Sequence, residues 1–471
     1  MGKLFLFGIG GTGSRVLRSL TMLLASGVKI DADEIVPIII DADHANKDLT
    51  RTIELIKKYN SIRGKLVFDN TTQNRFWSTK INTTILPGLL LPLHKSTNDD
   101  LFKDYIGASS MSKENQAIVS MLFSEKNLEA DMEVGFKGNP NIGSVVLNQF
   151  TITQKFKDIL DQFKDGDRIF IISSIFGGTG ASGFPLLAKN LRNLGGNFGN
   201  SQIIKDSPIG AITVLPYFDL TSSDDSEIDS STFVSKTIAA LQYYKEHLTE
   251  TNALYYVADD VTNQYENYEG GDLQANNAHI VELISALSII DFMSIPAEDI
   301  VTNDGVPQSP VFKEFGIKNG NATINFSDFC DVTNNIIRRP LSQFMLFAKY
   351  LKYYQDKQPW RDNFDKNFFS QPFFKNLETF IVDTFVWYKE LKENYRSFEP
   401  FNLDAQKDAL FEFVHGIKPA KIASLDSNYK LFDNRLNKHV NDAMKAQSAE
   451  QQFVELFYRA TNQLIEEKLK I

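Results

Sequence analysis

Two glycine-rich segments hold the residues of this chain that are best suited to chemistry. They are Gly10 to Gly13 and Gly177 to Gly180, and both read GGTG. Glycine lets a backbone approach a phosphate closely, and a helix that begins at such a segment adds N–H donors and a favourable dipole. Nothing in the sequence matches GxxxxGK[ST], which excludes a P-loop nucleoside triphosphatase. The two segments therefore predict a cradle for the diphosphate of a nucleotide.

Acidic residues follow the next predicted strand. Asp41 ends the run Ile35 to Ile40, where a GxGxxG fingerprint places an acid on a ribose, and Asp43 lies two residues further along. His44 adjoins them, but no further ligand lies at metal-binding spacing, so we interpret this stretch as a polar loop rather than a metal site. A third glycine-rich stretch, 135–143 (GFKGNPNIG), has by itself the composition of an ordinary turn.

Short apolar runs alternate with helical patterns over residues 1–300. The predicted strands are Lys3–Phe7, Ile35–Ile40, Arg168–Ser173, Pro208–Leu215 and Ala253–Val257, and helices are expected at Ser14–Ala25 and at about Pro185–Leu194. This alternation predicts an α/β fold with a doubly wound, mostly parallel sheet. Ligands bind such sheets at the carboxyl ends of the strands, which is where these glycines and aspartates fall.

The character of the chain changes in its last third. We expect a connecting segment over residues 301–340, with joints at Pro340 and within Val301 to Thr323, and a mainly helical region over 341–471. The last predicted helix has an apolar face made of Phe453, Leu456, Phe457, Ala460 and Leu464. Packing within the helical region is the favoured interpretation of that face, and a docking site for a protein partner is the alternative.

The composition argues against several classes of protein. The net charge of −10 disfavours nucleic-acid binding, which needs a basic face. The single cysteine, Cys330, allows no internal disulfide and no cysteine-rich zinc site, which favours a reducing cytoplasm. No apolar run approaches the roughly 20 residues that span a bilayer, so we expect no membrane insertion.

The order of these motifs resembles the tubulin/FtsZ superfamily and, more narrowly, its bacterial tubulin-like proteins. GxGGTG, DxD, GNPxxG and GGTG follow one another within residues 1–332, and the segments 138–143 (GNPNIG) and 176–185 (FGGTGASGFP) carry the likeness most specifically. The resemblance implies binding of GTP or GDP with Mg²⁺ and a slow GTPase activity. It also implies self-association in a filament, in which a neighbouring subunit completes the active site.

The resemblance further implies roles for individual residues. The phosphates would lie against Gly10, Gly11, Thr12, Gly13, Gly138, Asn139, Gly177, Gly178, Thr179 and Gly180, with Gly138 and Asn139 nearest the γ-phosphate. Asp41 and Asp43 would face the phosphates and touch Mg²⁺ through water, and Asp219 would lie near the ribose. A long central helix at about residues 273–290 would place Asn276 or Asn277 on the guanine edge.

The segment 324–332 (INFSDFCDV) resembles the loop that supplies acidic residues to the next subunit. The resemblance implies that Asp328 and Asp331 polarise the attacking water, since a carboxylate can orient water for in-line attack on a phosphate. An acidic helix cap followed by an apolar residue has the same pattern, so this alternative stays open.

Three other functions also stay open. A Rossmann oxidoreductase that binds NAD or FAD accounts for residues 8–41 but leaves the two later glycine-rich segments without a role. An adenylating enzyme shares the first glycine segment and the following DAD, although it often carries paired cysteines and Cys330 stands alone here. A non-catalytic, nucleotide-gated module would dock a partner through the helical C-terminal region.

Overall fold

A parallel sheet forms the centre of the first part of the chain. Its strands are β1 (Leu4–Ile9), β2 (Glu34–Ile40), β3 (Lys80–Ile81), β4 (Arg168–Ser174), β5 (Ile209–Val214), β7 (Ala253–Val257) and β11 (Val311–Glu314). The order of the seven strands is β11-β7-β5-β4-β1-β2-β3, and each neighbouring pair is parallel. The five predicted strands are all present. Strands buried on both faces explain why they appear in the sequence as continuous apolar runs.

The computed structural model describes most of the chain. The described residues are 2–43, 46–70, 72–92, 101–132, 136, 139–195, 199–220, 231–260, 263–265, 276–308, 311–314, 322–354, 359–404, 409–421 and 428–471.

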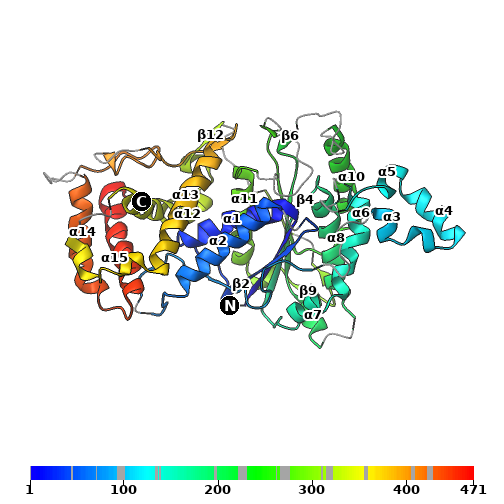
Figure 1. The fold of residues 1–471 in the computed structure, drawn as a ribbon, viewed down its shortest axis with the longest axis horizontal. Helices are drawn as coiled ribbons and strands as arrows, with labels where there is room; N and C mark the ends of the chain where they lie inside the picture. Colours follow the sequence, from blue (N-terminus) through cyan, green and yellow to red (C-terminus); the bar gives the residue numbers. More distant parts are fainter. Residues whose placement is uncertain are drawn as a thin grey trace.

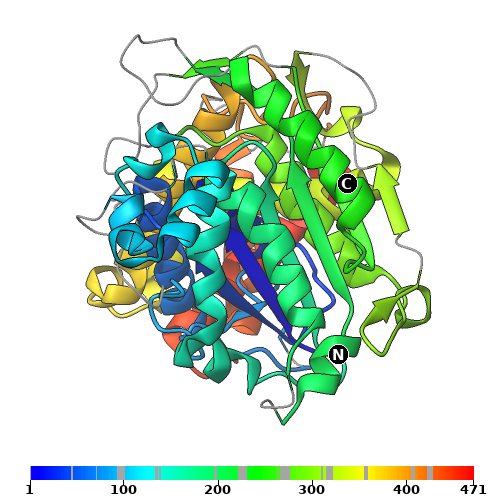
Figure 2. The ribbon, with the colours of Figure 1, turned by 90° about the vertical axis from the view of Figure 1, so that its right-hand side faces the viewer.

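Helices cover both faces of the sheet, as a doubly wound fold requires. On one face lie α1 (Gly10–Ala25), α2 (Lys47–Arg63) and α11 (Ile280–Ser294), between the sheet and the C-terminal region (Figure 1). The other face carries α6 (Pro140–Leu147), α8 (Gly178–Arg192) and α10 (Ser231–His247), behind which β1 is visible in Figure 2. Smaller helices are α3 (Phe102–Tyr105), α4 (Lys113–Leu122), α5 (Glu125–Leu128), α7 (Gln154–Leu160) and α9 (Ser201–Asp206). The predicted α/β fold is therefore confirmed.

The C-terminal region is helical. It contains α12 (Asp331–Tyr354), α13 (Pro372–Lys392), α14 (Asn428–Ala443) and α15 (Ala449–Leu464). Short two-stranded pairs complete the structure: β6 (Phe218–Leu220) with β8 (Asn263–Tyr265), β9 (Thr302–Asn303) with β10 (Val306–Pro307), and β12 (Thr323–Ile324) with β13 (Ser397–Phe398). Among the described residues, none of the helices has the length and apolar character needed to span a bilayer.

Two expected positions along the chain need correction, those of a joint at Pro340 and of a helix start near residue 273. Pro340 is not a joint, because α12 runs through it and buries Leu341, Phe344 and Met345 directly afterwards. The apolar face of α15 is fully buried in the helical core, which confirms the favoured interpretation, packing within the helical region, and excludes the alternative of a docking surface. The helix expected at about residues 273–290 is α11, which begins at Ile280 because the His279 side chain caps it there.

Candidate functional site

Two helices begin next to each other at the centre of the sheet. α1 follows β1 and α8 follows the neighbouring strand β4, on either side of the point where the strand order reverses. In an open parallel sheet this switch point is where ligands bind. The glycine segments form the first turns of α1 and α8, earlier than the predicted helix starts at Ser14 and Pro185.

Neither of these helices has a side-chain cap. Their N-cap residues are Ile9 and Gly177, and no acidic residue lies in either first turn. Side chains do cap α2, α4, α5, α7, α11 and α15. The first N–H groups of a helix have no partner within the helix, so α1 and α8 offer these donors and their positive dipole ends to an anion.

Close packing explains several of the glycines. A Cβ atom at Gly10, where φ is +69°, would lie 3.5 Å from the Thr179 Cβ, so the two first turns face each other. A Cβ atom at Gly180 would come within 2.6 Å of the Ser174 carbonyl oxygen, and one at Gly13 within 2.4 Å of the Gly8 carbonyl carbon. Only glycine therefore allows α8 to pack on the end of β4 and α1 on the end of β1.

Gly11 differs from these glycines. A Cβ atom there would make only ordinary contacts, at 3.5 Å from the Arg15 Nη1 and the Asn46 Nδ2. A side chain at position 11 would therefore fit without displacing its neighbours, so the first turn of α1 is open at this point.

The aspartates predicted to face Mg²⁺ lie beside this cradle. Asp41 and Asp43 follow β2, the strand next to β1, and both are buried. The Asp43 N–H donates to the Asp41 Oδ1 at 3.2 Å, whereas the buried Asp41 Oδ2 has no hydrogen-bond partner within the described residues. Burial, together with the nearby charge of Asp43, raises the pKa of Asp41 to about 7. An orphaned carboxylate oxygen of this kind fits a cation or a cation-bound water.

The predicted γ-phosphate residues are only partly described. Asn139 is the N-cap of α6, and its side chain accepts no capping hydrogen bond from the helix, whereas Gly138 lies outside the described residues. A Cβ atom at Gly143 of α6 would lie 2.3 Å from the Ser182 Oγ of α8, so α6 packs tightly against the start of α8. Asp219 lies in β6, and its side chain is outside the description.

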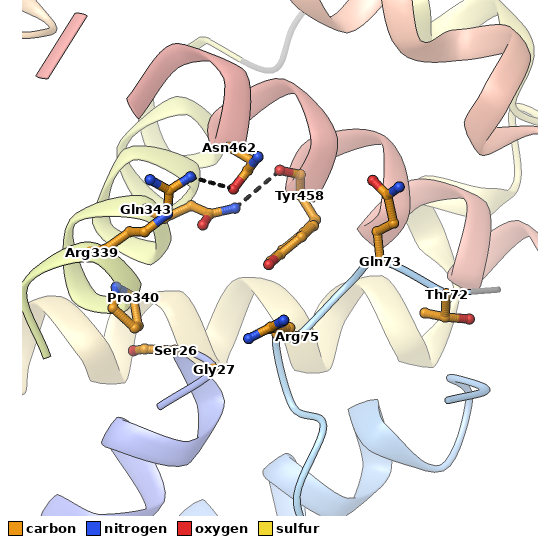
Figure 3. A pocket seen from close by; sticks show the side chains of 10 residues that line it. All are labelled: Ser26, Gly27, Thr72, Gln73, Arg75, Arg339, Pro340, Gln343, Tyr458 and Asn462. Carbon is orange, nitrogen blue, oxygen red and sulfur yellow. Dashed lines mark hydrogen bonds between the residues drawn. The ribbon is translucent and has the colours of Figure 1, made fainter. Parts of the chain in front are cut away.

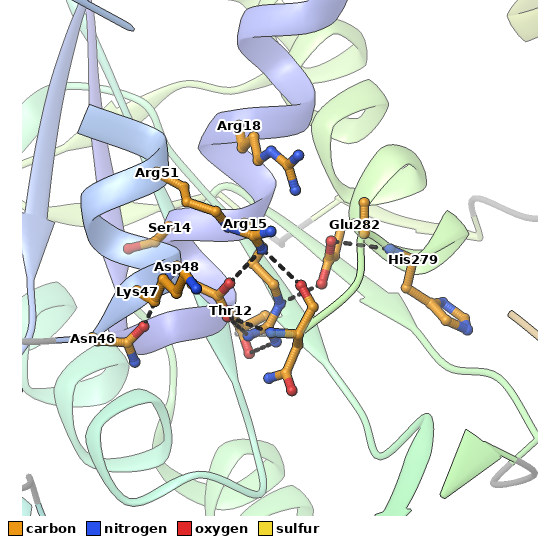
Figure 4. Close-up of polar contacts among 12 residues, drawn as sticks. Thr12, Ser14, Arg15, Arg18, Asn46, Lys47, Asp48, Arg51, His279 and Glu282 are labelled. Carbon is orange, nitrogen blue, oxygen red and sulfur yellow. Dashed lines mark hydrogen bonds and ion pairs between the residues drawn. The ribbon is translucent and has the colours of Figure 1, made fainter. Parts of the chain in front are cut away.

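A buried charge network closes the site on the side of α1, α2 and α11. Arg15 binds Asp48 at 2.9 Å and also pairs with Glu282, and its Nη2 donates to the Tyr217 hydroxyl at 2.9 Å. Figure 4 shows Arg15, Asp48 and Glu282 pointing toward one another from the three helices. Burial acts against the charge of Arg15, but Tyr217, Glu282 and Asp48 together raise its pKa well above the ordinary value. Arg15 is therefore a permanent cation at the edge of the first glycine turn.

The C-terminal region holds the segment that precedes α11. Glu390 of α13 accepts hydrogen bonds from Arg18 at 2.6 Å, Arg51 at 3.0 Å and the Ala278 N–H at 3.0 Å. The Asn394 amide donates to the Ala278 carbonyl oxygen at 2.7 Å. We call Glu390 and Asn394 the α13 clamp.

Asn276 and Asn277 lie immediately before the clamped residue and before α11. Arg51 donates to the Asn276 carbonyl oxygen at 2.8 Å, and the Asn276 N–H lies 3.5 Å from the Asp48 Oδ2. Both asparagines are half-buried, and both remain candidates for reading a base.

The two predicted catalytic acids differ in their surroundings. Asp328 is buried, and its Oδ2 accepts the Asn325 N–H at 2.9 Å in a capping box. This is the helix cap that the sequence left open as an alternative. Asp331 is the first residue of α12 and is exposed, so it alone of the pair is accessible to another molecule.

The charge network was not predicted from the sequence. Its members Arg15, Asp48, Tyr217, Glu282 and Glu390 are up to 372 residues from their partners in the chain. The one local signal is Arg15 and Arg18, two cations three residues apart on a helix that is otherwise uncharged.

Among the described residues, no group of three or more His, Cys, Asp or Glu side chains is arranged to hold a metal ion directly. His44 lies outside the described residues.

Comparison with known proteins adds little beyond this geometry. No protein-family model matches the chain, and no curated protein matches it. Among solved structures it is similar to CetZ2 from Haloferax volcanii, a GTPγS-bound protofilament, with 14% identity and a TM-score of 0.30 over 64% of this chain and 60% of that chain. It is also similar to CetZ from Methanosaeta thermophila, with 16% identity and a TM-score of 0.26 over 55% of this chain and 46% of that chain. The chain thus spans less than two thirds of each structure, and likeness at these values supports no inference about residues, ligand or activity.

Proposed function

We propose that this chain binds a guanine nucleotide, with the phosphates held between the first turns of α1 and α8. The observation that carries the proposal is the pair of uncapped helix starts that face each other at the switch point of the sheet. Two sets of free N–H donors and two positive dipole ends suit a diphosphate. Asn139, at the uncapped start of α6, supplies the corresponding position for a γ-phosphate.

Mg²⁺ accompanies the nucleotide in this proposal. Asp41 and Asp43 are buried acids near the first glycine turn, and once ionised they would repel a polyphosphate in the absence of a cation. The unpartnered Asp41 Oδ2 is the atom that would accept a hydrogen bond from water on the metal. Asp41 and Asp43 would orient the ion through its bound water, and the ion would neutralise phosphate charge.

The choice of guanine rests on the order of the sequence motifs. Asn276 and Asn277 are the candidate base readers, because the α13 clamp, Arg51 and Asp48 fix their backbone at the edge of the site. A nicotinamide dinucleotide would use the β1–α1 turn and Asp41 but would leave the uncapped start of α8 without a role.

Hydrolysis and assembly form a further part of the proposal. Asp331 is the exposed acid that would reach the γ-phosphate of a second copy, while Asp328 holds the segment in place through its cap. Asp331→Ala should abolish any GTP hydrolysis and leave nucleotide affinity unchanged. If GTP turnover is unchanged in this variant, the role of Asp331 is excluded.

A matched pair of glycine variants tests nucleotide binding. Gly11→Asp places a carboxylate in the phosphate cradle at a position where a Cβ atom fits, and Gly195→Asp makes the same change at an open position at the far end of α8. At about 4–5 Å and an effective dielectric constant near 20, one unit charge costs about 3–4 kcal/mol, so fluorescent GDP should bind Gly11→Asp at least 100-fold more weakly. Equal affinities in Gly11→Asp, Gly195→Asp and the wild type would exclude the proposed cradle.

A second candidate is a nucleotide-gated module that does not polymerise. The α13 clamp favours it, because a nucleotide that moves Asn276 or Asn277 must also move Ala278 and thereby the C-terminal region. Light scattering with GTP separates the two candidates. An increase in scattering when GTP is added to the wild type, and a different response in Asp331→Ala, supports assembly. A protein that stays monomeric in every nucleotide state supports the module.

A further inference from the structure

A pocket of about 510 Å³ lies where the sheet-containing part of the chain meets the helical region. One wall comes from the turn after α1, at Ser26 and Gly27, and from Arg75, and the other comes from α12 and α15 (Figure 3). It is at the opposite end of α1 from the glycine turn, so it is separate from the proposed nucleotide site. Its size is that of a pocket for a small organic molecule.

The lining is basic in an acidic protein. Arg75 and Arg339 both line the pocket, and no aspartate or glutamate is among its described lining residues, although the whole chain carries a net charge of −10. Glu466, whose side chain is 58% exposed, pairs with Arg339 at 2.6 Å and offsets part of this charge. The carbonyl end of α1 carries only a fraction of an elementary charge, so the pocket retains a positive balance.

Arg75 has no partner in the described part of the chain. Its side chain is exposed and lines the pocket, and no hydrogen bond or ion pair from another described residue engages its guanidinium. Arg339, by contrast, is held by Asn462 at 2.9 Å, by Glu466 and by the Ile471 carbonyl oxygen, so its position is fixed. The Arg339 guanidinium therefore has a fixed position, whereas the Arg75 guanidinium can move to contact a ligand.

Tyr458 lines the pocket together with the two arginines. Burial raises the pKa of its phenol, Arg75 and Arg339 act in the opposite direction, and Glu455 and Glu466 add to the rise. The Tyr458 ring reaches from α15 toward Arg75 (Figure 3). Among the described residues the hydroxyl has no hydrogen-bond partner. It adds one neutral donor beside the two cations.

The walls of the pocket are fixed by other contacts. The Trp77 N–H donates to the Ala25 carbonyl oxygen at 3.1 Å, and the Asn74 N–H donates to Glu455 at 3.0 Å, which holds Arg75 from both sides. Gln343 donates to the Tyr458 carbonyl oxygen at 3.0 Å. A preformed pocket of this kind loses little entropy when it binds a ligand.

We propose that this pocket binds a small organic anion through Arg75, Arg339 and the Tyr458 hydroxyl. Phosphate esters and polycarboxylates share the required chemistry, because both present planar or tetrahedral oxygen groups that a guanidinium fork binds in bidentate fashion. Such a ligand would bridge the sheet-containing part and the helical region.

Calorimetric titration of the full chain with inorganic pyrophosphate and with citrate tests the proposal. We expect saturable binding of at least one anion with a dissociation constant below about 1 mM. Arg75→Gln should weaken it at least tenfold, whereas Arg338→Gln, a matched change one residue from Arg339 that does not line the pocket, should leave it unchanged. Binding of pyrophosphate alone identifies a phosphate ligand, and binding of citrate alone identifies a carboxylate ligand.

Pyrophosphate could also bind the glycine turns, so the same titration is repeated in Gly11→Asp. Binding that persists in Gly11→Asp and weakens in Arg75→Gln supports the pocket, whatever the outcome for the nucleotide site. The proposal is overturned if neither anion binds saturably, if Arg75→Gln binds like the wild type, or if binding is lost in Gly11→Asp instead.

Discussion

Asp41 should make the nucleotide-free protein less stable as the pH rises. Its carboxyl group is buried beside Asp43, one oxygen has no hydrogen-bond partner among the described residues, and burial raises its pKa from 3.8 to about 7. The folded state therefore binds the proton more tightly than the unfolded state does. The stability linked to that proton is fully present below the unfolded pKa and is lost as the pH rises through the folded pKa.

The size of this effect follows from the shift. One pKa unit corresponds to about 1.4 kcal/mol, so a shift of roughly three units costs about 4 kcal/mol once Asp41 is ionised at pH 8. Asp41→Asn cannot ionise, so the variant should be more stable than the wild type at pH 8 by up to about 4 kcal/mol. The two proteins should converge toward pH 4.

Urea unfolding in EDTA, without nucleotide, measures this difference. Midpoints at pH 5, 6.5 and 8 should fall with pH in the wild type and in Asp158→Asn, an exposed aspartate on α7 that serves as the control. They should fall much less in Asp41→Asn. A parallel fall in Asp41→Asn, or a variant less stable than the wild type at pH 8, would refute the assignment of this cost to Asp41.

Three further perturbations test other parts of the structure. Arg15→Gln leaves Asp48 and Glu282 without their shared buried cation and should lower the free energy of unfolding by about 3–5 kcal/mol, whereas Arg15→Gln with Glu282→Gln should lose less; equal losses in urea unfolding would contradict the network. Gly180→Ala should lower the free energy of unfolding by about 1–3 kcal/mol, because its Cβ would lie 2.6 Å from the Ser174 carbonyl oxygen, while Gly11→Ala should stay close to the wild type; the reverse order in thermal melts would show that the helix starts pack differently. In a fluorescence titration, removal of Mg²⁺ with EDTA should weaken GDP binding at least tenfold in the wild type but only slightly in the double variant Asp41→Asn/Asp43→Asn. A larger loss of GDP affinity in the double variant than in the wild type would exclude these acids from the metal's surroundings.

The sheet was predictable because its central strands are apolar throughout. β1, β2, β4, β5 and β7 all lie within or beside the runs identified in the sequence. The edge strands were not predicted, because β3 has two residues, Lys80 and Ile81, and β11 (VFKE) contains two charges. Edge strands make fewer contacts and so need less apolar sequence.

Helix starts were placed too late for a physical reason. Glycine disfavours helix interiors, so propensity places the starts of α1 and α8 after the glycines, whereas both helices include them. Close approach to β1 and β4 explains the glycines better than flexibility does, and the same geometry exposes the N–H groups. At Asp328 a cap and a catalytic acid share one sequence pattern, and the Asn325 hydrogen bond shows that the cap is present.

Long-range charge pairs lie beyond what the sequence reveals. The partners Arg15 and Glu282 are 267 residues apart, and Arg18 and Glu390 are 372 residues apart. In the sequence, each of these residues has the character of a charged residue on the exposed face of a helix. It becomes buried only because α1, α11 and α13 pack against one another. The α13 clamp and the pocket between Arg75 and Arg339 arise in the same way, from contacts between the two halves of the chain.

Calorimetric titration with unlabelled nucleotides tests the central claim most directly. The purified protein, in a buffer that contains Mg²⁺, is titrated separately with GDP, GTP, ADP, ATP and NAD. The proposal predicts one site per chain for GDP or GTP, with affinity at least tenfold above that for ADP, ATP or NAD, and loss of that site in Gly11→Asp but not in Gly195→Asp. Tighter binding of NAD or ATP, or no saturable binding of any guanine nucleotide, would contradict it.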